Sequence, residues 1–280
     1  MSLMKIGVVG YGLIGGSMGL ALKKYTSHTV YAFEKSREVI AYIEKNSLAD
    51  GAFLPESEKI SECDIIFIGL YPGKTVDFIK ENKERFKDNA IICDLCGVKK
   101  YVVENIPENI RFIGAHPMAG KEVNGIENAD CDLFLNASFL ITVDKSTDEE
   151  ALKIIKGLAI KVGFFKVVET TPENHDRMIT FTSQLPHILS VAYVLQDAFK
   201  KCDGFYAGSF KDMARVAKIN PNLWEELFKI NKGILTEQLD EYVNTLLNIK
   251  AMILQEDKEL YKTLVKSREL KEWQDENYKN

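Results

Sequence analysis

A glycine pattern that lies between a short apolar run and a segment of helical spacing constrains this chain most. The apolar run covers residues 6–9, and the pattern follows it directly. In such a strand–turn–helix unit the first glycine permits a tight turn, the second lets the backbone approach a pyrophosphate, and the third lets the helix pack on the strand. The helix N-terminus would face the anion. The run Gly10-Tyr11-Gly12-Leu13-Ile14-Gly15 therefore predicts a dinucleotide site, to which we assign Gly10, Gly12, Leu13, Ile14 and Gly15.

Apolar runs alternate with helix-like segments through the first half of the chain. The apolar runs cover residues 6–9, 30–33, 65–70, 91–93, 112–115 and 139–143, and a helix at 149–161 with a strand at 164–168 would complete the series. This alternation predicts a parallel sheet with helices on both faces, and nearly continuous apolar runs are typical of strands buried on both sides. The predicted fold class is α/β, a Rossmann-type doubly wound parallel sheet.

The pattern becomes helical after residue 170. Pro172 suits the first turn of a helix capped by Thr171, and no convincing strand follows. Residues 175–199 are apolar nearly all round, which indicates a buried helix, and Pro186 should kink it. We expect an all-helical C-terminal domain.

Apolar residues recur at steps of three and four between residues 223 and 253, as one face of a long helix or of two. That face is long for a small domain, so we expect it to pair with a second copy of the chain. The tail from residue 255 is polar, and its helix should be exposed. The predicted domains are residues 1–170, which bind the dinucleotide, and residues 171–280, which bind substrate and dimerise.

Composition excludes several classes of protein. The 280 residues carry a net charge of -5, with 46% hydrophobic and 28% charged residues, as in a soluble globular protein without affinity for nucleic acid or anionic membranes. No stretch approaches the ~18 apolar residues of a membrane span. An odd number of cysteines indicates free thiols in a reducing, cytoplasmic setting. Cys93 and Cys96 have CxxC spacing but lack a second ligand pair, so we expect no metal.

Glu34 ends the second apolar run, about 20 residues after the glycine pattern, where a carboxylate accepts hydrogen bonds from the adenine ribose hydroxyls. The same carboxylate would repel the extra phosphate of NADP, so NAD is the predicted cofactor. Lys35 and Arg37 follow and could attract such a phosphate, which keeps NADP as an alternative.

Two stretches lie immediately after predicted strands, and ligands of doubly wound sheets bind beyond the carboxyl ends of their strands. One stretch runs from Asp94 to Lys99 and the other is His116-Pro117. We assign Asp94 to the cofactor and consider His116 a candidate for the chemistry.

Three further motifs follow in order: His116-Pro117-Met118-Ala119-Gly120-Lys121-Glu122, Ser183-Gln184-Leu185-Pro186-His187 and Gly208-Ser209-Phe210-Lys211-Asp212-Met213-Ala214-Arg215. With the glycine pattern they make the chain resemble the prephenate/arogenate dehydrogenase family over most of its length. The resemblance implies oxidative decarboxylation of prephenate to 4-hydroxyphenylpyruvate in tyrosine biosynthesis, or of arogenate to tyrosine, by a homodimer. A different dehydrogenase acting on a β-hydroxy acid or an imine, or a non-catalytic NAD-binding regulator, remains an alternative.

The resemblance also implies roles for named residues. His116 falls on the catalytic histidine of the family, and a neutral imidazole is suited to accept the proton of an alcohol near neutral pH. Arg215 would hold a substrate carboxylate with its two-pronged guanidinium group, and Asp212, three residues earlier on the same helix, would orient it. His187 and Glu122 are expected to line the same pocket.

Two residues depart from the family pattern. Gly97 stands where the family usually has a serine that assists the catalytic histidine, so a hydroxyl is missing unless water, the thiol of Cys96 or a substrate group replaces it. Gln184 replaces the first histidine of the helical motif, and an amide cannot change its charge near neutral pH. We assign both Gly97 and Gln184 to the substrate pocket.

Overall fold

The computed structural model describes residues 3–145 and 147–278. The chain forms two compact units, one of residues 1–231 and one of residues 232–280. The first unit contains the sheet together with the helices that follow it up to residue 231. The predicted domain boundary near residue 170 marks the end of the strand pattern, and it stays a prediction.

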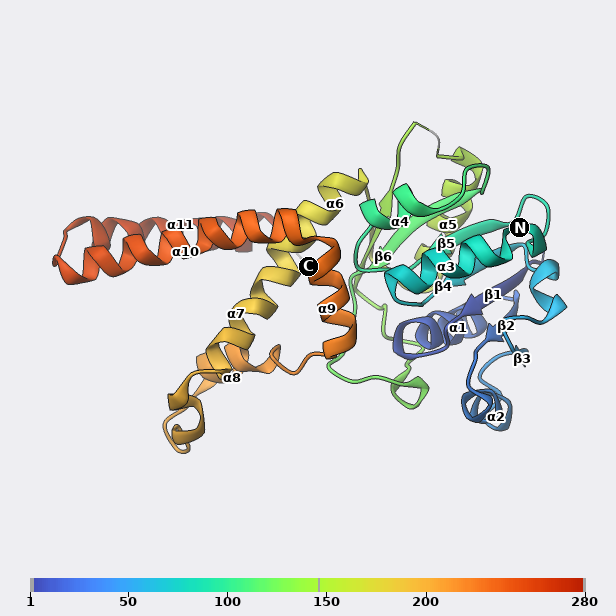
Figure 1. Cartoon of the computed structure of the whole chain (residues 1–280), viewed down its shortest axis with the longest axis horizontal. Coiled ribbons are helices and arrows are strands. Elements are labelled where there is room, and N and C mark those ends of the chain that lie inside the picture. The colour runs from blue at the N-terminus through green and yellow to red at the C-terminus, as the bar shows by residue number, and fades with distance from the viewer. Residues whose placement is uncertain (1–2, 146, 279–280) are drawn as a thin grey trace. The chain divides into compact units, whose positions relative to one another are not determined.

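Within the described residues, eight strands form one sheet in the order β3-β2-β1-β4-β5-β6-β7-β8 (Figure 1). Every neighbouring pair is parallel except β6 with β7. The predicted α/β class is therefore confirmed. The strands are β1 (Lys5–Val9), β2 (Thr29–Phe33), β3 (Gly51–Phe53), β4 (Ile65–Ile68), β5 (Ile91–Asp94), β6 (Phe112–Pro117), β7 (Ser138–Thr142) and β8 (Lys166–Thr170).

The antiparallel pairing of β6 with β7 departs from the expected parallel sheet. Its register places His116 opposite Leu140. Between the two strands the described chain contains no α-helix, only a 3-10 turn at Ile126–Asn128. Parallel neighbours need a crossover to the other end of the sheet, whereas a chain that returns from the same edge pairs antiparallel. The short edge strand β3 is also absent from the sequence prediction.

Helices flank the sheet and also follow it in the chain (Figure 1). Two predicted helix starts are confirmed, because Asp148 accepts a hydrogen bond from the Ala151 amide at 2.6 Å and Thr171 accepts one from the Asn174 amide at 3.2 Å. The helices are α1 (Leu13–Tyr25), α2 (Arg37–Lys45), α3 (Pro72–Asn82), α4 (Lys100–Asn105), α5 (Glu149–Lys161), α6 (Pro172–Ile179), α7 (Leu185–Val194), α8 (Gly208–Arg215), α9 (Pro221–Ile230), α10 (Lys232–Leu254) and α11 (Glu259–Asn277).

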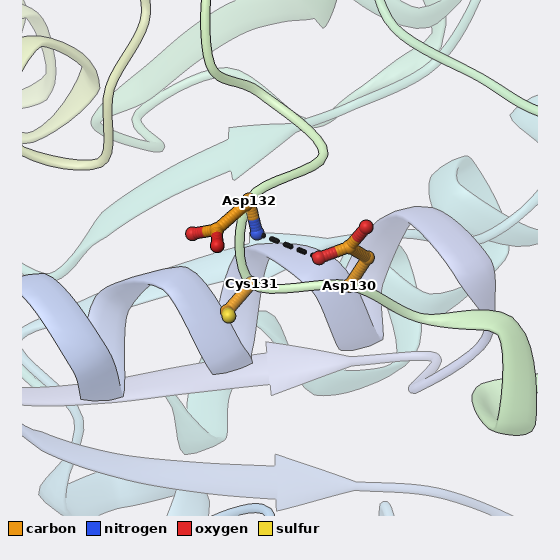
Figure 2. Close-up of side chains that lie close together, drawn as sticks. All are labelled: Asp130, Cys131 and Asp132. Carbon is orange, nitrogen blue, oxygen red and sulfur yellow. Dashed lines mark hydrogen bonds between the residues drawn. The ribbon is translucent and has the colours of Figure 1, made fainter.

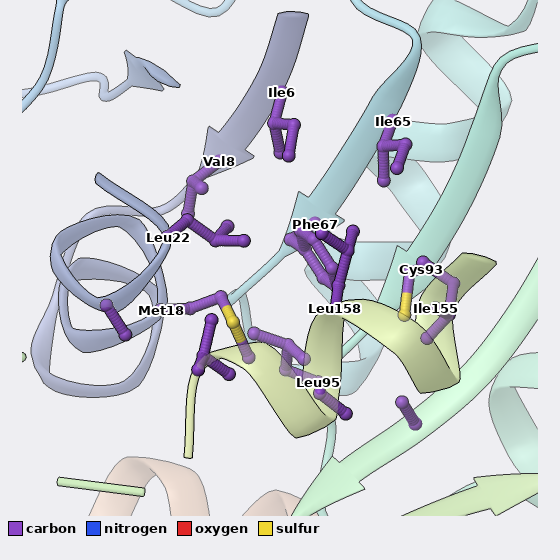
Figure 3. Close-up of a cluster of buried hydrophobic side chains, with 14 of the residues drawn as sticks. Ile6, Val8, Met18, Leu22, Ile65, Phe67, Cys93, Leu95, Ile155 and Leu158 are labelled. Atoms are coloured by element: carbon purple, nitrogen blue, oxygen red, sulfur yellow. The ribbon is translucent and has the colours of Figure 1, made fainter. Parts of the chain in front are cut away.

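The core lies on both faces of the sheet because consecutive strand residues point to opposite sides. On one face, side chains of β1, β4 and β5 pack against α1 and α5 (Figure 3). On the other, the alternate residues of the same strands pack against α3. The side chains drawn for the first face include Ile6, Val8, Met18, Leu22, Ile65, Phe67, Ile155 and Leu158. Burial on both sides explains why the strands read as unbroken apolar runs.

The helical stretch around Pro186 is interrupted. A π-helical turn at Thr180–Gln184 separates α6 from α7 and comes directly before the proline. A proline ring clashes with the carbonyl four residues earlier, and a widened turn relieves that clash. The expectation of a helix buried all round is wrong for this chain alone, because Phe181 is 63% exposed and Leu195 is 75% exposed.

The long apolar pattern that begins at residue 223 divides into α9 and α10. The break falls at Asn231, which is buried and whose side-chain amide donates to the Thr180 hydroxyl at 2.6 Å and to Gln184 Oε1 at 3.1 Å. In the second unit α10 and α11 pack side by side (Figure 1). No residue of α11 is buried, as predicted for the polar tail. None of the described helices is both long and apolar enough to cross a membrane.

A buried ion pair joins the carboxyl ends of β5 and β6. The Lys99 ammonium group bonds to Asp94, and both side chains are fully buried. Lys99 also donates to the Ala115 carbonyl at 2.5 Å, and the other oxygen of Asp94 accepts from the Ala115 amide at 3.2 Å. An unpaired charge at this depth would cost several kcal/mol, at least ~3. The pair therefore fixes the end of β5 against the end of β6, the strand that carries His116.

Candidate active site

The three motif glycines lie in different environments. Gly10 has a φ of +80°, and a Cβ there would lie 2.6 Å from Leu70 Cδ2. A Cβ on Gly15 would lie 2.1 Å from the Gly10 carbonyl oxygen, so only glycine allows α1 to approach the turn this closely. At Gly12 a Cβ would meet no atom within 4 Å, which leaves the backbone open to a ligand.

This turn lies where the strand order reverses, because β1 has β2 on one side and β4 on the other. Glu34 follows β2 directly, and its carboxylate accepts from the Tyr11 amide at 3.1 Å and the Lys35 amide at 2.8 Å. These bonds fix the carboxylate beside the turn and leave lone pairs for ribose hydroxyls. The open backbone at Gly12, the N-terminus of α1 and the carboxylate together fit a dinucleotide.

Asp94, which we assigned to the cofactor, has a side chain that is fully engaged. One oxygen accepts from the Cys96 amide at 3.0 Å and pairs with Lys99, and the other accepts from Ala115. Its carboxylate is enclosed, so any contact with a cofactor would be made by the backbone. Its assignment stays a prediction.

His116 lies on β6 and contacts a second histidine from α6. The distance from His116 Nδ1 to His175 Nε2 is 3.0 Å, and that from His175 Nδ1 to Asp176 Oδ1 is 2.8 Å. The Asp176 carboxylate in turn accepts the Lys99 amide at 2.8 Å and the Lys100 amide at 3.0 Å. A string of hydrogen bonds thus runs from the loop after β5 to the His116 ring.

Electrostatics favour the neutral form of both histidines. Burial lowers the pKa of His116 well below its ordinary value of 6.5, and the proximity of His175 and Lys99 lowers it further. Burial also lowers the pKa of His175, against the opposing effect of its bond to Asp176. A neutral His116 retains one ring nitrogen with a free lone pair, which is what a general base requires.

Gly97 lies beside His116, as its predicted place in the pocket requires. A Cβ on Gly97 would lie 3.9 Å from His116 Cε1 and 3.6 Å from Leu227 Cδ2, both ordinary contacts. A serine would therefore fit at this position without a backbone change. The glycine is thus not required by the packing around it.

The thiol of Cys96 does not replace the missing hydroxyl. Its sulfur lies 3.3 Å from the Thr75 hydroxyl and 3.5 Å from the Leu70 carbonyl, and no bond to His116 occurs among the described residues. Burial raises the pKa of this thiol far above its ordinary range, which keeps it protonated. Of the three replacements expected from the sequence, water and a substrate group remain.

Arg215 meets Glu122 rather than Asp212. The Arg215 guanidinium at the end of α8 pairs with Glu122 in the loop after β6, with side-chain exposures of 62% and 36%. Asp212 is exposed and has no ion pair among the described residues, so no contact with Arg215 supports its predicted orienting role. The structure brings Glu122 and Arg215 together across 93 residues of sequence.

His187 and Gln184 both occupy the junction of the π-turn with α7. His187 stacks on Trp224 with ring centroids 3.9 Å apart, and its Nδ1 bonds to the Ser183 carbonyl at 2.7 Å. Burial lowers the pKa of His187. Gln184 is buried, and its Nε2 has no partner among the described residues, so a ligand oxygen or a water would satisfy it.

One group among the described residues gathers possible metal ligands, in the loop before β7: Asp130, Cys131 and Asp132 (Figure 2). Asp130 accepts from the Lys121 ammonium at 3.1 Å, and Asp132 accepts from Lys24 at 2.7 Å. Asp130 also accepts from the Asp132 amide at 2.9 Å. Lysines already compensate the charge of these carboxylates, and the bond between Asp130 and the Asp132 amide stabilises the loop. The group therefore offers no argument for a metal.

His175, Asp176 and Lys99 are not among the site residues predicted from the sequence. The available signal was a histidine next to an aspartate near the start of a helix that begins with Pro172. Such a pair suggests chemistry only when a third group faces it. That third group, His116, lies 59 residues away in the sequence.

Comparisons with known proteins cover most of the chain. The family model of the prephenate dehydrogenase nucleotide-binding domain matches residues 18–167, and that of the prephenate dehydrogenase dimerization domain matches residues 171–267. The prephenate dehydrogenase of Bacillus subtilis (strain 168) is 29% identical over 263 residues, which cover 90% of this chain and 71% of that protein.

Solved structures agree with these matches. A crystal structure of prephenate dehydrogenase from A. aeolicus in complex with hydroxyphenyl propionate and NAD+ has a TM-score of 0.85 at 27% identity and covers 98% of this chain and 99% of its own. The crystal structure of Synechocystis arogenate dehydrogenase has a TM-score of 0.83 at 26% identity and covers 96% and 99%. The likeness therefore includes both the sheet and the helices.

The two glycines of the turn should respond differently to alanine. Gly15→Ala places a methyl group against the Gly10 backbone, so we expect the melting temperature to fall by about 5 °C or more, together with a loss of NAD affinity. Gly12→Ala meets no protein atom, so we expect an unchanged melting temperature but NAD binding weakened about 10-fold or more. Thermal melts and NAD titrations measure both. Unweakened NAD binding by Gly12→Ala would contradict the site.

Proposed function

We propose that the chain, which belongs to the prephenate dehydrogenase family, catalyses the NAD-dependent oxidative decarboxylation of prephenate to 4-hydroxyphenylpyruvate in tyrosine biosynthesis. When bound, NAD accepts the hydride from the ring carbon that bears the hydroxyl. Loss of the ring carboxylate as carbon dioxide then makes the ring aromatic. The observation that carries this proposal is the position of His116 at the carboxyl end of β6, where its Nδ1 bonds to His175 and its Nε2 has no partner among the described residues.

His116 acts as the general base. Its Nδ1 contacts His175, and its Nε2 has no partner among the described residues and is not enclosed by protein. This nitrogen is the one available to accept the hydroxyl proton while hydride leaves the same carbon. Removal of the hydroxyl proton at that moment lowers the barrier, because the oxygen becomes a carbonyl oxygen as the hydride leaves.

Arg215 holds a carboxylate of the substrate. Its guanidinium is paired with Glu122, and both side chains are partly exposed, so the pair contributes little stability. A substrate carboxylate can accept two parallel hydrogen bonds from the guanidinium and would replace Glu122. His187, stacked on Trp224, and the unpaired amide of Gln184 complete the polar groups that we assign to the pocket.

Arogenate is the second candidate substrate. It carries an ammonium group where prephenate carries a keto group, so a carboxylate close to the side chain of the substrate would favour it. Glu122 is a carboxylate beside the assigned clamp, and the likeness to the Synechocystis arogenate dehydrogenase points the same way. The relatives named for prephenate lead us to rank prephenate first.

A second copy of the chain is the proposed partner, through the helical part, and the cytoplasm is the proposed location. The matching family model is described as a dimerization domain. In the second unit, α10 and α11 leave large apolar side chains exposed, among them Leu247 at 54%, Leu254 at 72% and Leu264 at 59%. Apolar surface of this extent on a helix pair is typical of a face that another chain covers.

Activity tests the function directly. With NAD, we expect prephenate to be oxidised with higher kcat/KM than arogenate, followed by the absorbance of the reduced nicotinamide and by release of carbon dioxide. A preference for arogenate would assign the second substrate. If the protein binds NAD but oxidises neither prephenate nor arogenate, the function would be that of a regulator or of a different dehydrogenase. NADP as efficient as NAD would contradict the role of Glu34.

His116→Asn should lower kcat about 100-fold or more while NAD still binds, because the proton acceptor is lost. In the parent enzyme His116 must be neutral to act as the base. The neutral fraction falls only when the pH approaches the pKa of His116, which burial holds below 6.5. We therefore expect kcat/KM to stay level as the pH falls through 6.5 and to decline only at lower pH, where the His116 imidazole takes up a second proton. Near-normal turnover by His116→Asn would remove the assignment.

Arg215→Ala should raise KM for prephenate about 10-fold or more, with a smaller effect on kcat, because the carboxylate clamp is lost. Lys218→Ala is the matched control, since it removes an exposed cation three residues away. It should leave KM within about 2-fold of the parent. Equal effects of the two variants would indicate general electrostatics in place of a clamp.

The mass in solution tests the partner. Light scattering should give twice the 31.7 kDa of one chain. Leu247→Glu together with Leu254→Glu should shift the mass toward one chain, because charges on that face cannot be buried against a second copy. Thr245→Glu, on the opposite side of the same helix, is the control for added negative charge, and it should leave the mass unchanged. A parent mass of one chain would contradict the dimer.

A further inference from the structure

We propose that His175 is a positioning residue that fixes the orientation and tautomer of His116, a role that the residue at position 97 cannot take because it is glycine. The proposal rests on the assignment of His116 as the base. His175 does not need to touch substrate or cofactor for this role. It acts through its contact with the His116 ring.

The hydrogen bonds around His175 have a defined direction. The two Asp176 oxygens already accept the amides of Lys99 and Lys100, so Asp176 acts as an acceptor toward His175 Nδ1 as well. The proton of that bond therefore belongs to His175 Nδ1. A neutral imidazole has one proton, so His175 Nε2 can only accept.

The direction then passes to His116. Because His175 Nε2 accepts, the His116 Nδ1 at 3.0 Å must donate, and the single proton of neutral His116 is held on Nδ1. This leaves the lone pair on His116 Nε2, the nitrogen without a protein partner. The tautomer needed in a base is thus set by two backbone amides in the loop after β5, relayed by Asp176 and His175.

The surroundings favour the neutral form of both histidines and exclude water from the hydrogen bonds of His175. His175 and Asp176 are 1% and 2% exposed, so water does not compete for their bonds. The charged groups beside the histidines are Asp94 at the end of β5 and Lys99 in the loop after it, which pair with each other, and Asp176 from α6 itself. Burial lowers the pKa of both imidazoles, so neither takes up a second proton near neutral pH.

No other described side chain performs this task. His175 is the only hydrogen-bond partner of His116 among the described residues. At position 97 a side chain would come within 3.9 Å of His116 Cε1, close enough for a serine hydroxyl to reach a ring nitrogen. Gly97 leaves that place empty of side-chain atoms, so orientation of the base depends on His175 in this chain.

The first experiment measures the tautomers in the parent protein. Nitrogen NMR of protein labelled in its histidines should show both His116 and His175 protonated on Nδ1 at neutral pH, with assignments from His116→Asn and His175→Gln. A proton on His116 Nε2 would overturn the proposal. This readout does not need turnover, so it is separate from the outcome of the activity assay.

The second experiment is a double-mutant cycle. His175→Ala should lower kcat about 10-fold to 100-fold, with KM and NAD affinity within about 2-fold, because only the orientation of the base is lost. Gly97→Ser should raise kcat in the His175→Ala variant. The factor of that increase should be about 5 times the factor by which Gly97→Ser changes kcat in the parent, because the serine hydroxyl then bonds to His116 in place of His175. Thermal melts check that each variant is folded.

Two results would contradict the role. One is a kcat of His175→Ala within about 2-fold of the parent. The other is an equal effect of Gly97→Ser with and without His175, which would mean that the two positions do not act on the same ring. If His175→Ala does not fold, His175→Gln replaces it in the cycle, because its amide preserves volume and one hydrogen bond. Loss of activity in the parent would instead count against the proposed function.

Discussion

The buried pair of Asp94 and Lys99 is the interaction on which the rest of the site depends. A fully enclosed lysine is tolerated only when its charge is compensated, and here the partners are one carboxylate and the carbonyl of Ala115. The pair closes the loop after β5 and joins that loop to β6. Both the strand that presents His116 and the backbone amides that face the helical segment are thereby held in place.

The same loop connects the sheet to the helices by directed hydrogen bonds. Two of its amides bind Asp176, which orients His175, which contacts His116. Asn231, directly after α9, bonds to Thr180 and Gln184 and so holds the π-turn in place. Polar groups at this depth are stable because they bond to one another, and their directionality makes the arrangement unique.

Much of the fold could be predicted because its determinants are local. The three glycines, the cap at Thr171 and the two-sided burial of the strands each depend on a few neighbouring residues. The direction of β7 and the π-turn before Pro186 could not, since each depends on where the chain returns or how a helix relieves a clash. The apolar character of residues 175–199 predicted burial, but within one chain α7 keeps exposed apolar side chains.

The sequence by itself determined the α/β class, the dinucleotide turn and the identity of the candidate base, because these reside in contiguous motifs. Only the tertiary structure decided what surrounds that base. The partner of Arg215 is Glu122 and not the nearby Asp212, and the partner of His116 is His175, 59 residues away. Side chains from distant elements meet according to strand register and helix packing, which no spacing along the chain records.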